Sequence, residues 1–285
     1  MNKNKILITG STGFIGTELI KSFKKAKIYF VSKKKIKKKY AHHINIQCDL
    51  RKKNSIKAVL EKIKPTIIYH LAWHGIPNFN EQNFQINKKI SNNLIEAINS
   101  SYCKKIIISG SCAEYGNQKS PVKEYYNKRD KISALGKQKN YIRKLFYKKL
   151  NKDIICIWSR IFYVYGLGQR SGSLLNSIMN CKEKIFELNQ SNVFNDFIYI
   201  KDVISALIAI KKINKSLIIN ICNGVAYSNL NFASTFSKFL NIRTISKKNK
   251  SNDSKIILYG SNKLLKQAGW KSRFDLRDSF KDILS

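Results

Sequence analysis

The sequence predicts an α/β fold, in which a doubly wound parallel sheet is joined by a smaller lobe towards the C-terminus. Three observations predict it. Apolar segments of strand length alternate with segments of helical periodicity through the first half of the chain. A glycine-rich segment joins the first strand to the first helix. The 285 residues are 43% hydrophobic and 25% charged, which is typical of globular proteins and excludes a wholly disordered chain.

The first half of the chain contains the repeating strand–helix units. In residues 14–25 apolar side chains recur at helical spacing, and the helix expected at 56–63 stops before Pro65. Because parallel neighbouring strands need crossover helices, the alternation predicts helices on both faces of the sheet. The expected strands are residues 5–9, 28–31, 44–48, 67–70, 106–109 and 154–159, and the expected helices are residues 14–25, 56–63, 84–99 and 137–150.

The second half has a looser pattern, without repeats or a low-complexity linker. We expect two domains, with residues 1–165 carrying the large sheet and residues 166–285 forming a smaller α/β lobe whose segments can interleave with the first. In this half the expected helices are residues 174–180, 203–213, 232–240 and 276–284, and the expected strands are residues 197–200 and 218–221.

The glycine-rich segment follows the first strand and opens the first helix. Glycines at such a junction allow a tight turn and close approach of the backbone to a pyrophosphate. The helix N-terminus adds unpaired N–H groups and a positive dipole. This placement predicts a dinucleotide site and makes residues 1–165 a Rossmann-type domain. The loop residues expected to bind the cofactor are Gly10, Ser11, Thr12, Gly13, Phe14, Ile15 and Gly16.

The glycine spacing and a series of later motifs resemble the extended short-chain dehydrogenases/reductases, the NAD-dependent epimerase/dehydratase family, which mostly act on nucleotide-diphosphate sugars. The motifs follow one another in the family's order over almost the whole chain. The resemblance implies that the residues of four of them lie at the cofactor: Asp49 and Leu50 after the third strand, Leu71 and Ala72 after the fourth, Asn87 in the following helix, and Ser109 at the end of the fifth strand.

The end of the second strand bears on the choice between NAD and NADP. An acidic residue there would bind the 2′-hydroxyl of NAD, whereas basic residues suit the 2′-phosphate of NADP. The segment reads Val31-Ser32-Lys33-Lys34-Lys35, with no acidic residue. Because Ser32 and Lys33 can bind a phosphate, we expect NADP as the cofactor, with NAD as the second choice.

Members of this family use a Ser or Thr, a Tyr and a Lys, the last two placed four residues apart on one helix face. The resemblance assigns the hydroxyl to Ser111 and the amine to Lys139, but Leu135 stands at the tyrosine position. Three alternatives remain. Ser111, Tyr125, Tyr126 or a water supplies the proton; the enzyme is slow, since a lost general acid costs about 10²–10⁴-fold in rate; or the chain binds nucleotides without turnover.

The sequence also bears on the reaction and the substrate. Dehydratases of this family carry an Asp-Glu pair where this chain has Cys112 and Ala113, so we expect no dehydratase activity. Glu114 lies one position too late to replace the pair. Five residues are expected to bind substrate: Trp73, Ser111, Tyr163, Arg170 and Asn195. Trp73, Tyr163 and Asn195 stand where the family usually has another residue, and Arg170 is a candidate to take over the diphosphate contact.

The net charge of +37 comes from 46 Lys and only 8 Arg, set against 17 acidic residues. The lysines are spread along the chain rather than concentrated in one arginine-rich or aromatic tract, so we expect no nucleic-acid partner. No signal peptide or transmembrane segment is evident, and we expect no membrane partner. The six cysteines lack metal-site spacing, which predicts reduced thiols, a cytoplasmic location and no metal.

The function that the resemblance implies is a nucleotide-sugar oxidoreductase, most concretely a 4-keto-6-deoxy-sugar reductase that supplies sugars for surface polysaccharide such as lipopolysaccharide. One alternative is a nucleotide-sugar 4-epimerase, an isomerase that retains NAD. The other is a catalytically impaired dinucleotide-binding protein, because of Leu135. The resemblance also implies a homodimer that packs through residues 84–99 and 137–150.

Overall fold

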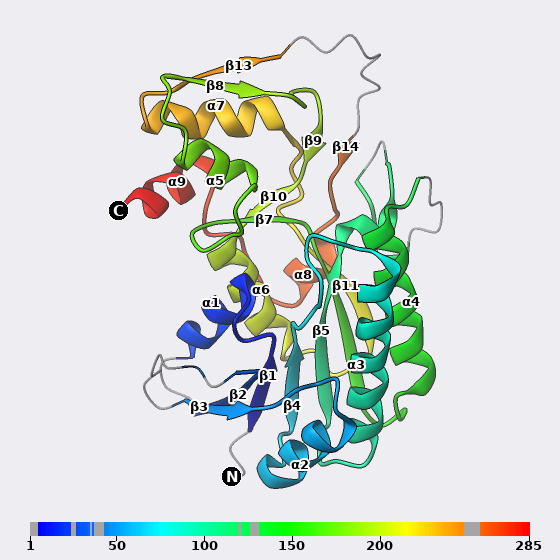
Figure 1. Cartoon of the computed structure of the whole chain (residues 1–285). Coiled ribbons are helices and arrows are strands. Elements are labelled where there is room, and N and C mark those ends of the chain that lie inside the picture. The colour runs from blue at the N-terminus through cyan, green and yellow to red at the C-terminus, as the bar shows by residue number, and fades with distance from the viewer. Residues whose placement is uncertain are drawn as a thin grey trace. The chain divides into compact units, whose positions relative to one another are not determined.

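The computed structural model describes residues 5–23, 27–34, 36, 43–118, 121–125, 131–247 and 257–285. It confirms the predicted α/β class. Seven strands form one sheet in the order β11-β6-β5-β4-β1-β2-β3 (Figure 1), and the pairs β1–β2, β2–β3, β1–β4 and β4–β5 are parallel. The strands are β1 Ile6–Thr9, β2 Ile28–Ser32, β3 Ile44–Gln47, β4 Ile67–His70, β5 Lys105–Ser111, β6 Ile155–Ile161 and β11 Leu217–Ile221.

The described chain divides into two compact units. Unit 1 comprises Met1–Glu114, Ile132–Arg160 and Lys211–Ile219, and unit 2 comprises Tyr115–Lys131, Ile161–Ile210 and Asn220–Ser285. The division into domains at residues 1–165 and 166–285 stays a prediction.

Unit 1 is layered, with helices on both faces of its sheet. One face packs against α2, α3 and α4, in a core that includes Leu7 and Ile68 from the strands and Leu94 and Phe146 from the helices. Phe23, just after α1, contacts Tyr69 of β4 with ring centroids 6.3 Å apart. In the described part of unit 1 the α-helices are α1 Phe14–Ser22, α2 Lys53–Ile63, α3 Glu81–Asn99 and α4 Ala134–Lys149.

Unit 2 has an aromatic core. Phe197 stacks on Phe232 at 4.2 Å between centroids, and Tyr165 and Phe280 meet Phe232 edge-on. The remaining elements are η1 Cys112–Tyr115, β7 Tyr163–Tyr165, α5 Leu174–Met179, β8 Ile185–Leu188, β9 Phe194–Asn195, β10 Phe197–Tyr199, α6 Ile200–Ile210, β12 Tyr227–Ser228, α7 Asn229–Phe239, β13 Arg243–Ser246, β14 Ile257–Leu258, α8 Lys263–Gln267 and α9 Leu276–Leu284.

Several element boundaries differ from the predicted ones. α4 begins at Ala134 rather than at residue 137, because the Ser133 hydroxyl accepts a hydrogen bond from the Gly136 N–H and caps the helix. Leu135 therefore lies inside the first turn, one turn before Lys139. α6 ends at Ile210, so the helix expected to extend to residue 213 is shorter at its C-terminus.

Candidate functional site

The glycine loop has the geometry expected of a phosphate-binding turn. Gly10 has φ of 72°, and a Cβ built there would lie 2.5 Å from the backbone of Leu71 and Ala72. A Cβ on Gly16 would lie 2.1 Å from the Gly10 carbonyl oxygen. Only glycine fits these two positions, which brings the loop against the segment that follows β4.

The N-terminus of α1 is open towards an anion. The helix has no side-chain cap and no acidic residue in its first turn. The Ser11 hydroxyl donates to the Val31 carbonyl oxygen at 2.8 Å, which ties the loop to β2. The backbone N–H groups of the first turn, which includes Phe14 and Ile15, thus fit a pyrophosphate. Thr12 lies on the exposed part of the turn.

The ends of β2 and β3 lie side by side, as the adenosine side of such a site requires. The Ser32 hydroxyl is engaged within the loop, because it donates to the Lys34 carbonyl oxygen at 2.7 Å and accepts from Asn45 at 2.8 Å. Lys33 is exposed, and its charge helps to lower the pKa of Asp49. Lys33 is therefore the better placed of the two predicted phosphate ligands; Lys35 lies outside the described residues.

Asp49 is held by a neighbouring arginine. Arg51 binds its carboxylate through two nitrogens, at 2.9 and 2.6 Å, and these hydrogen bonds lower the pKa of Asp49 to about 2. The Asn93 side chain donates to the Leu50 carbonyl oxygen at 3.0 Å and fixes the loop against α3. Asp49 is thus an ionised hydrogen-bond acceptor at neutral pH, at a position predicted to lie at the cofactor.

The loop after β4 is fixed by Asn87 of α3. The Asn87 amide accepts from the His74 N–H at 2.8 Å and donates to the His74 carbonyl oxygen at 3.0 Å. His70 is buried, and its Nδ1 lies 2.7 Å from the Thr9 hydroxyl. Burial lowers the pKa of His70 to about 3, so the ring is neutral and holds β1 and β4 together.

Lys139 of α4 is buried in unit 1 beside Ser109 and Trp73. Its Nζ donates to the Ser109 carbonyl oxygen at 2.7 Å and lies 3.9 Å from the centre of the Trp73 ring. Burial lowers the pKa of Lys139 to about 7, and the charge of Glu114 opposes the shift. The structure thus brings the predicted residues Trp73, Ser109 and Lys139 together.

The Ser111 hydroxyl stands at the end of β5, where its oxygen accepts from the Ala113 N–H at 3.2 Å. Leu135 is half-buried at the position where a tyrosine was expected. Of the alternative proton donors, Tyr125 is exposed and belongs to unit 2, and Tyr126 lies outside the described residues.

Glu114 belongs to a buried network rather than to the reaction centre. Its carboxylate accepts from Arg160 Nε at 2.9 Å, from the Trp158 indole at 2.8 Å and from the Ser111 N–H at 2.9 Å. Arg143 adds an ion pair at 3.4 Å. This network shapes the turn that presents Ser111. The sequence analysis did not predict this network, although the acidic Glu114 so close to Ser111 was a signal for it.

Unit 2 brings the other predicted substrate residues together. Tyr163, Arg170 and Asn195 all line one hollow of about 800 Å³. The Asn195 side chain donates to Asn229 at 2.9 Å, while its buried Oδ1 has no hydrogen-bond partner among the described residues. Such an acceptor suits a ligand that carries an N–H or O–H group. That these three residues bind substrate stays a prediction.

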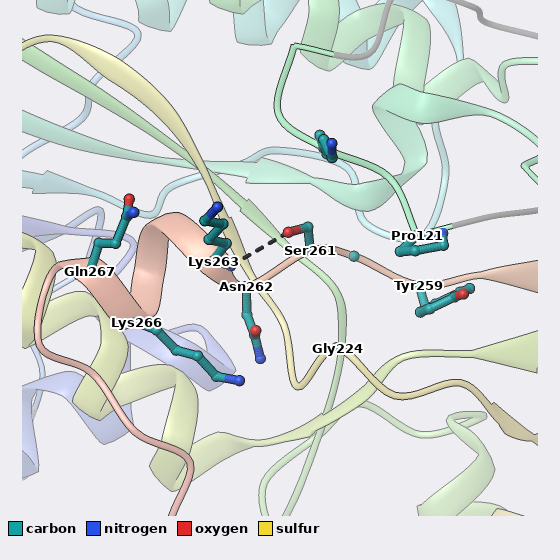
Figure 2. A pocket seen from close by; sticks show the side chains of 10 residues that line it. Pro121, Gly224, Tyr259, Ser261, Asn262, Lys263, Lys266 and Gln267 are labelled. Atoms are coloured by element: carbon teal, nitrogen blue, oxygen red, sulfur yellow. Dashed lines mark hydrogen bonds between the residues drawn. The ribbon is translucent and has the colours of Figure 1, made fainter.

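A second hollow in unit 2, of about 620 Å³, surrounds the start of α8 (Figure 2). Lys123, Lys263 and Lys266 are among its lining residues, and the Lys263 N–H donates to the Ser261 hydroxyl at 3.5 Å. None of the residues predicted to bind cofactor or substrate lines it. In the described ranges no group of His, Cys, Asp and Glu side chains could hold a metal ion, and no helix could cross a membrane.

Known proteins resemble the chain over most of its length. A GDP-6-deoxy-D-talose 4-dehydrogenase from Aggregatibacter actinomycetemcomitans is 28% identical over 233 residues, which is 79% of this chain and 76% of that protein. The structure of an ADP-L-glycero-D-manno-heptose-6-epimerase from Helicobacter pylori superposes with a TM-score of 0.82 at 23% identity and covers 99% of this chain and 95% of that one.

A UDP-glucuronic acid 4-epimerase from Bacillus cereus, solved in complex with UDP-glucuronic acid and NAD, superposes with a TM-score of 0.81 at 21% identity, covering 98% of this chain and 97% of that one. These likenesses establish the same fold. The model of the NAD dependent epimerase/dehydratase family matches residues 6–222, which include the glycine loop, Ser111 and Lys139. The chain therefore belongs to the NAD-dependent epimerase/dehydratase family.

Proposed function

We propose that the protein is an NADP-dependent oxidoreductase that acts at C4 of a nucleotide-linked 4-keto-6-deoxy sugar. The observation that carries the proposal is the site in unit 1, where a glycine turn fit for a pyrophosphate lies in the same unit as a buried amine, Lys139, and a hydroxyl, Ser111. A nicotinamide dinucleotide supplies hydride when bound there, and the protein's own residues hold the sugar and handle the proton.

The residues present favour oxidoreduction over elimination of water. Cys112 and Ala113 carry no carboxyl group, and Glu114 is fully buried and paired with Arg160. A carboxylate held in this way cannot exchange protons with a sugar. Lys33, exposed beside Asp49, and the lack of an acidic residue at the end of β2 support NADP over NAD.

Two observations support the choice of substrate. The 4-dehydrogenase of A. actinomycetemcomitans is named for a nucleotide-linked 6-deoxy sugar, and this chain resembles it over 233 residues. In unit 2, Tyr163, Arg170 and Asn195 offer a hydroxyl, a guanidinium and an unpaired acceptor around one hollow. We propose that these groups bind the nucleotide-diphosphate part, with Arg170 on the diphosphate.

A 4-epimerase is the second candidate function. The similarity in fold to 4-epimerases and a 6-epimerase favours it, and such an enzyme would retain its NAD through both half-reactions. The third is a dinucleotide-binding protein without turnover, favoured by Leu135. As partners we propose a second copy of the chain and no nucleic acid or membrane. The proposed setting is the cytoplasm, in the supply of sugars for surface polysaccharide.

The proposal is tested by following NADPH consumption, with NADH in parallel, on a panel of nucleotide-linked 4-keto-6-deoxy sugars. Turnover that prefers NADPH is the expected result. Tightly retained NAD together with interconversion of C4 epimers would favour the epimerase instead. Cofactor binding by fluorescence, with neither reduction of a 4-keto sugar nor interconversion of C4 epimers, would overturn both enzymatic functions and leave the dinucleotide-binding protein.

A further inference from the structure

Trp73 has a buried hydrogen-bond donor without an acceptor. The indole Nε1 is shielded from solvent, and none of the described residues accepts from it, although the side chain as a whole is only half-buried and packs against the core. The other two tryptophans have partners, since Trp158 donates to Glu114 and Trp270 donates to Ser205, both at 2.8 Å. A buried unpaired N–H is costly and points to a ligand atom that accepts from it.

The position of this donor is fixed by its neighbours. Trp73 follows Leu71 and Ala72, whose backbone lies against the glycine turn at Gly10. The face of its ring is directed at Lys139, with 3.9 Å between Nζ and the ring centre. Because the N–H lies in the ring plane, the contact with Lys139 leaves it available for another group.

Lys139 also has unused donors. An ammonium has three N–H groups, and the structure assigns one of them, to the Ser109 carbonyl oxygen. One helical turn earlier, Leu135 offers no hydroxyl with which the lysine could share a proton. The hydroxyl hydrogen of Ser111 likewise has no acceptor in the described part of unit 1.

We propose that Trp73 and Lys139 together do the work of the missing tyrosine: Lys139 Nζ gives the proton to the sugar oxygen, and the Trp73 N–H donates a hydrogen bond to that oxygen. This inference rests on the proposed function. In the reducing direction the carbonyl carbon gains hydride from the nicotinamide dinucleotide, the new O–H bond takes its proton from Nζ, and the amine left neutral regains a proton from water.

The two residues have different roles because their acidities differ. The indole N–H is a donor only and cannot release its proton, so it stabilises the charge that develops on the oxygen. Lys139 can release one, since burial lowers its pKa to about 7, within the range suited to a general acid. The titratable groups whose charges reach it are Glu114 of η1, which is paired with Arg160, and His70 of β4, which is neutral.

The test compares Trp73→Phe with the parent protein. Phenylalanine can keep a ring face towards Lys139, and it removes the N–H together with part of the ring volume. We expect kcat to fall about 10²–10³-fold, as on loss of one oxyanion donor, while the Kd for NADPH measured by fluorescence stays unchanged. The matched control, Trp270→Phe, removes an indole N–H outside this site and should leave kcat within a few-fold of the parent.

A second variant distinguishes the loss of a donor from damage to the fold. Adding Leu135→Tyr to Trp73→Phe places a hydroxyl one turn before Lys139, and at least a tenfold recovery of kcat is expected. Independently of turnover, the three indole N–H signals in a ¹⁵N-tryptophan NMR spectrum report on the pair. We expect the Trp73 signal to titrate near pH 7 and to lose this titration in Lys139→Met.

The outcomes separate the two proposals. If the parent reduces a 4-keto sugar and Trp73→Phe keeps its rate, or if the Trp73 signal does not respond to Lys139, the inference is overturned and the proposed function stands. If the parent turns over none of the sugars, the proposed function and this proton transfer both fail. If Trp73→Phe lowers kcat and the added Leu135→Tyr restores it, the result supports both the proposed function and this proton transfer.

Discussion

Lys139, the proposed catalytic amine, is a single buried residue whose charge is costly to hold in the fold. Its pKa is lowered to about 7 by burial, from an ordinary value of 10.5. Between these two values the unfolded chain binds more protons than the folded one, so folding should become more favourable as the pH rises from 7 to 10. Below pH 7 the full cost of burying the charge is present.

Lys139→Met should remove this cost. We expect the variant to have a higher free energy of unfolding than the parent at pH 6, and the difference to shrink as the pH approaches 10. Urea unfolding of both proteins across this range measures it. Lys144→Met, at an exposed position on the same helix, is the control and should show no such trend. If the parent gains no stability above pH 7 relative to Lys139→Met, the lowered pKa of Lys139 is contradicted.

The proposed preference for NADP can be tested at one residue. Lys33 is exposed at the end of β2, while the Ser32 hydroxyl is already engaged with Lys34 and Asn45. Lys33→Ala should weaken NADPH binding about tenfold, which is the size of one charge-assisted contact, and leave NADH binding nearly unchanged. Fluorescence titration with both cofactors measures this, with Lys21→Ala on α1 as the control. An equal loss for NADH would show that Lys33 does not select a 2′-phosphate.

At the scale of elements, the strand–turn–helix unit β1–α1 contains the glycine turn proposed to bind the phosphates of the cofactor. A Cβ on Gly16 would lie 2.1 Å from the Gly10 carbonyl oxygen, whereas one on Gly13 would meet the same oxygen at 3.3 Å. Gly16→Ala should therefore displace the turn and abolish detectable cofactor binding. Gly13→Ala demands a shift of only a few tenths of an ångström. If both variants bound NADPH like the parent, the turn would not be the cofactor site.

The elements that sequence could predict are the periodic ones. Ile67–His70 and Leu276–Leu284 match the expected strand and helix, because apolar spacing is set by local geometry. Strands of two residues, such as Phe194–Asn195, are too short to show a period. The residues of the candidate site divide in the same way, into those that the sequence could predict and those that it could not. The order of the motifs located Ser111 and Lys139, but the contact of Trp73 with Lys139 depends on how distant segments pack, and no local pattern records it.

Asp196 is a second residue whose role could not be predicted from the sequence. It begins the sequence motif Asp-Phe-Ile-Tyr, and its buried carboxylate accepts three backbone N–H groups, from Asn223, Gly224 and Gly260, at 2.8 to 3.1 Å. The residue therefore holds two loops of unit 2 together. A motif of this kind marks a position in the fold, and its chemical role becomes apparent only when its partners are known.

At the scale of the whole molecule, charge should govern self-association. The proposed dimer packs through α3 and α4, and the exposed face of α4 carries Lys137, Lys144 and Lys148 around Tyr141. Tyr141 meets Phe84 of α3 edge-on at 5.4 Å, which offers a small aromatic patch. In a chain with a net charge of +37, two such faces repel each other until salt screens them.

The dimer should therefore become tighter as ionic strength rises from about 0.05 M to about 0.5 M, because the Debye length shrinks from above 10 Å to below 5 Å. Sedimentation equilibrium at the two salt concentrations measures the shift. Lys144→Glu removes part of the repulsion and should strengthen the dimer most at low salt. Tyr141→Ala reduces the aromatic patch and should weaken it at both. A dimer that dissociates as salt is added would instead be held by ion pairs, such as those that the lysines of α4 could make with the exposed Glu81 and Glu96 of α3, and would contradict this repulsion.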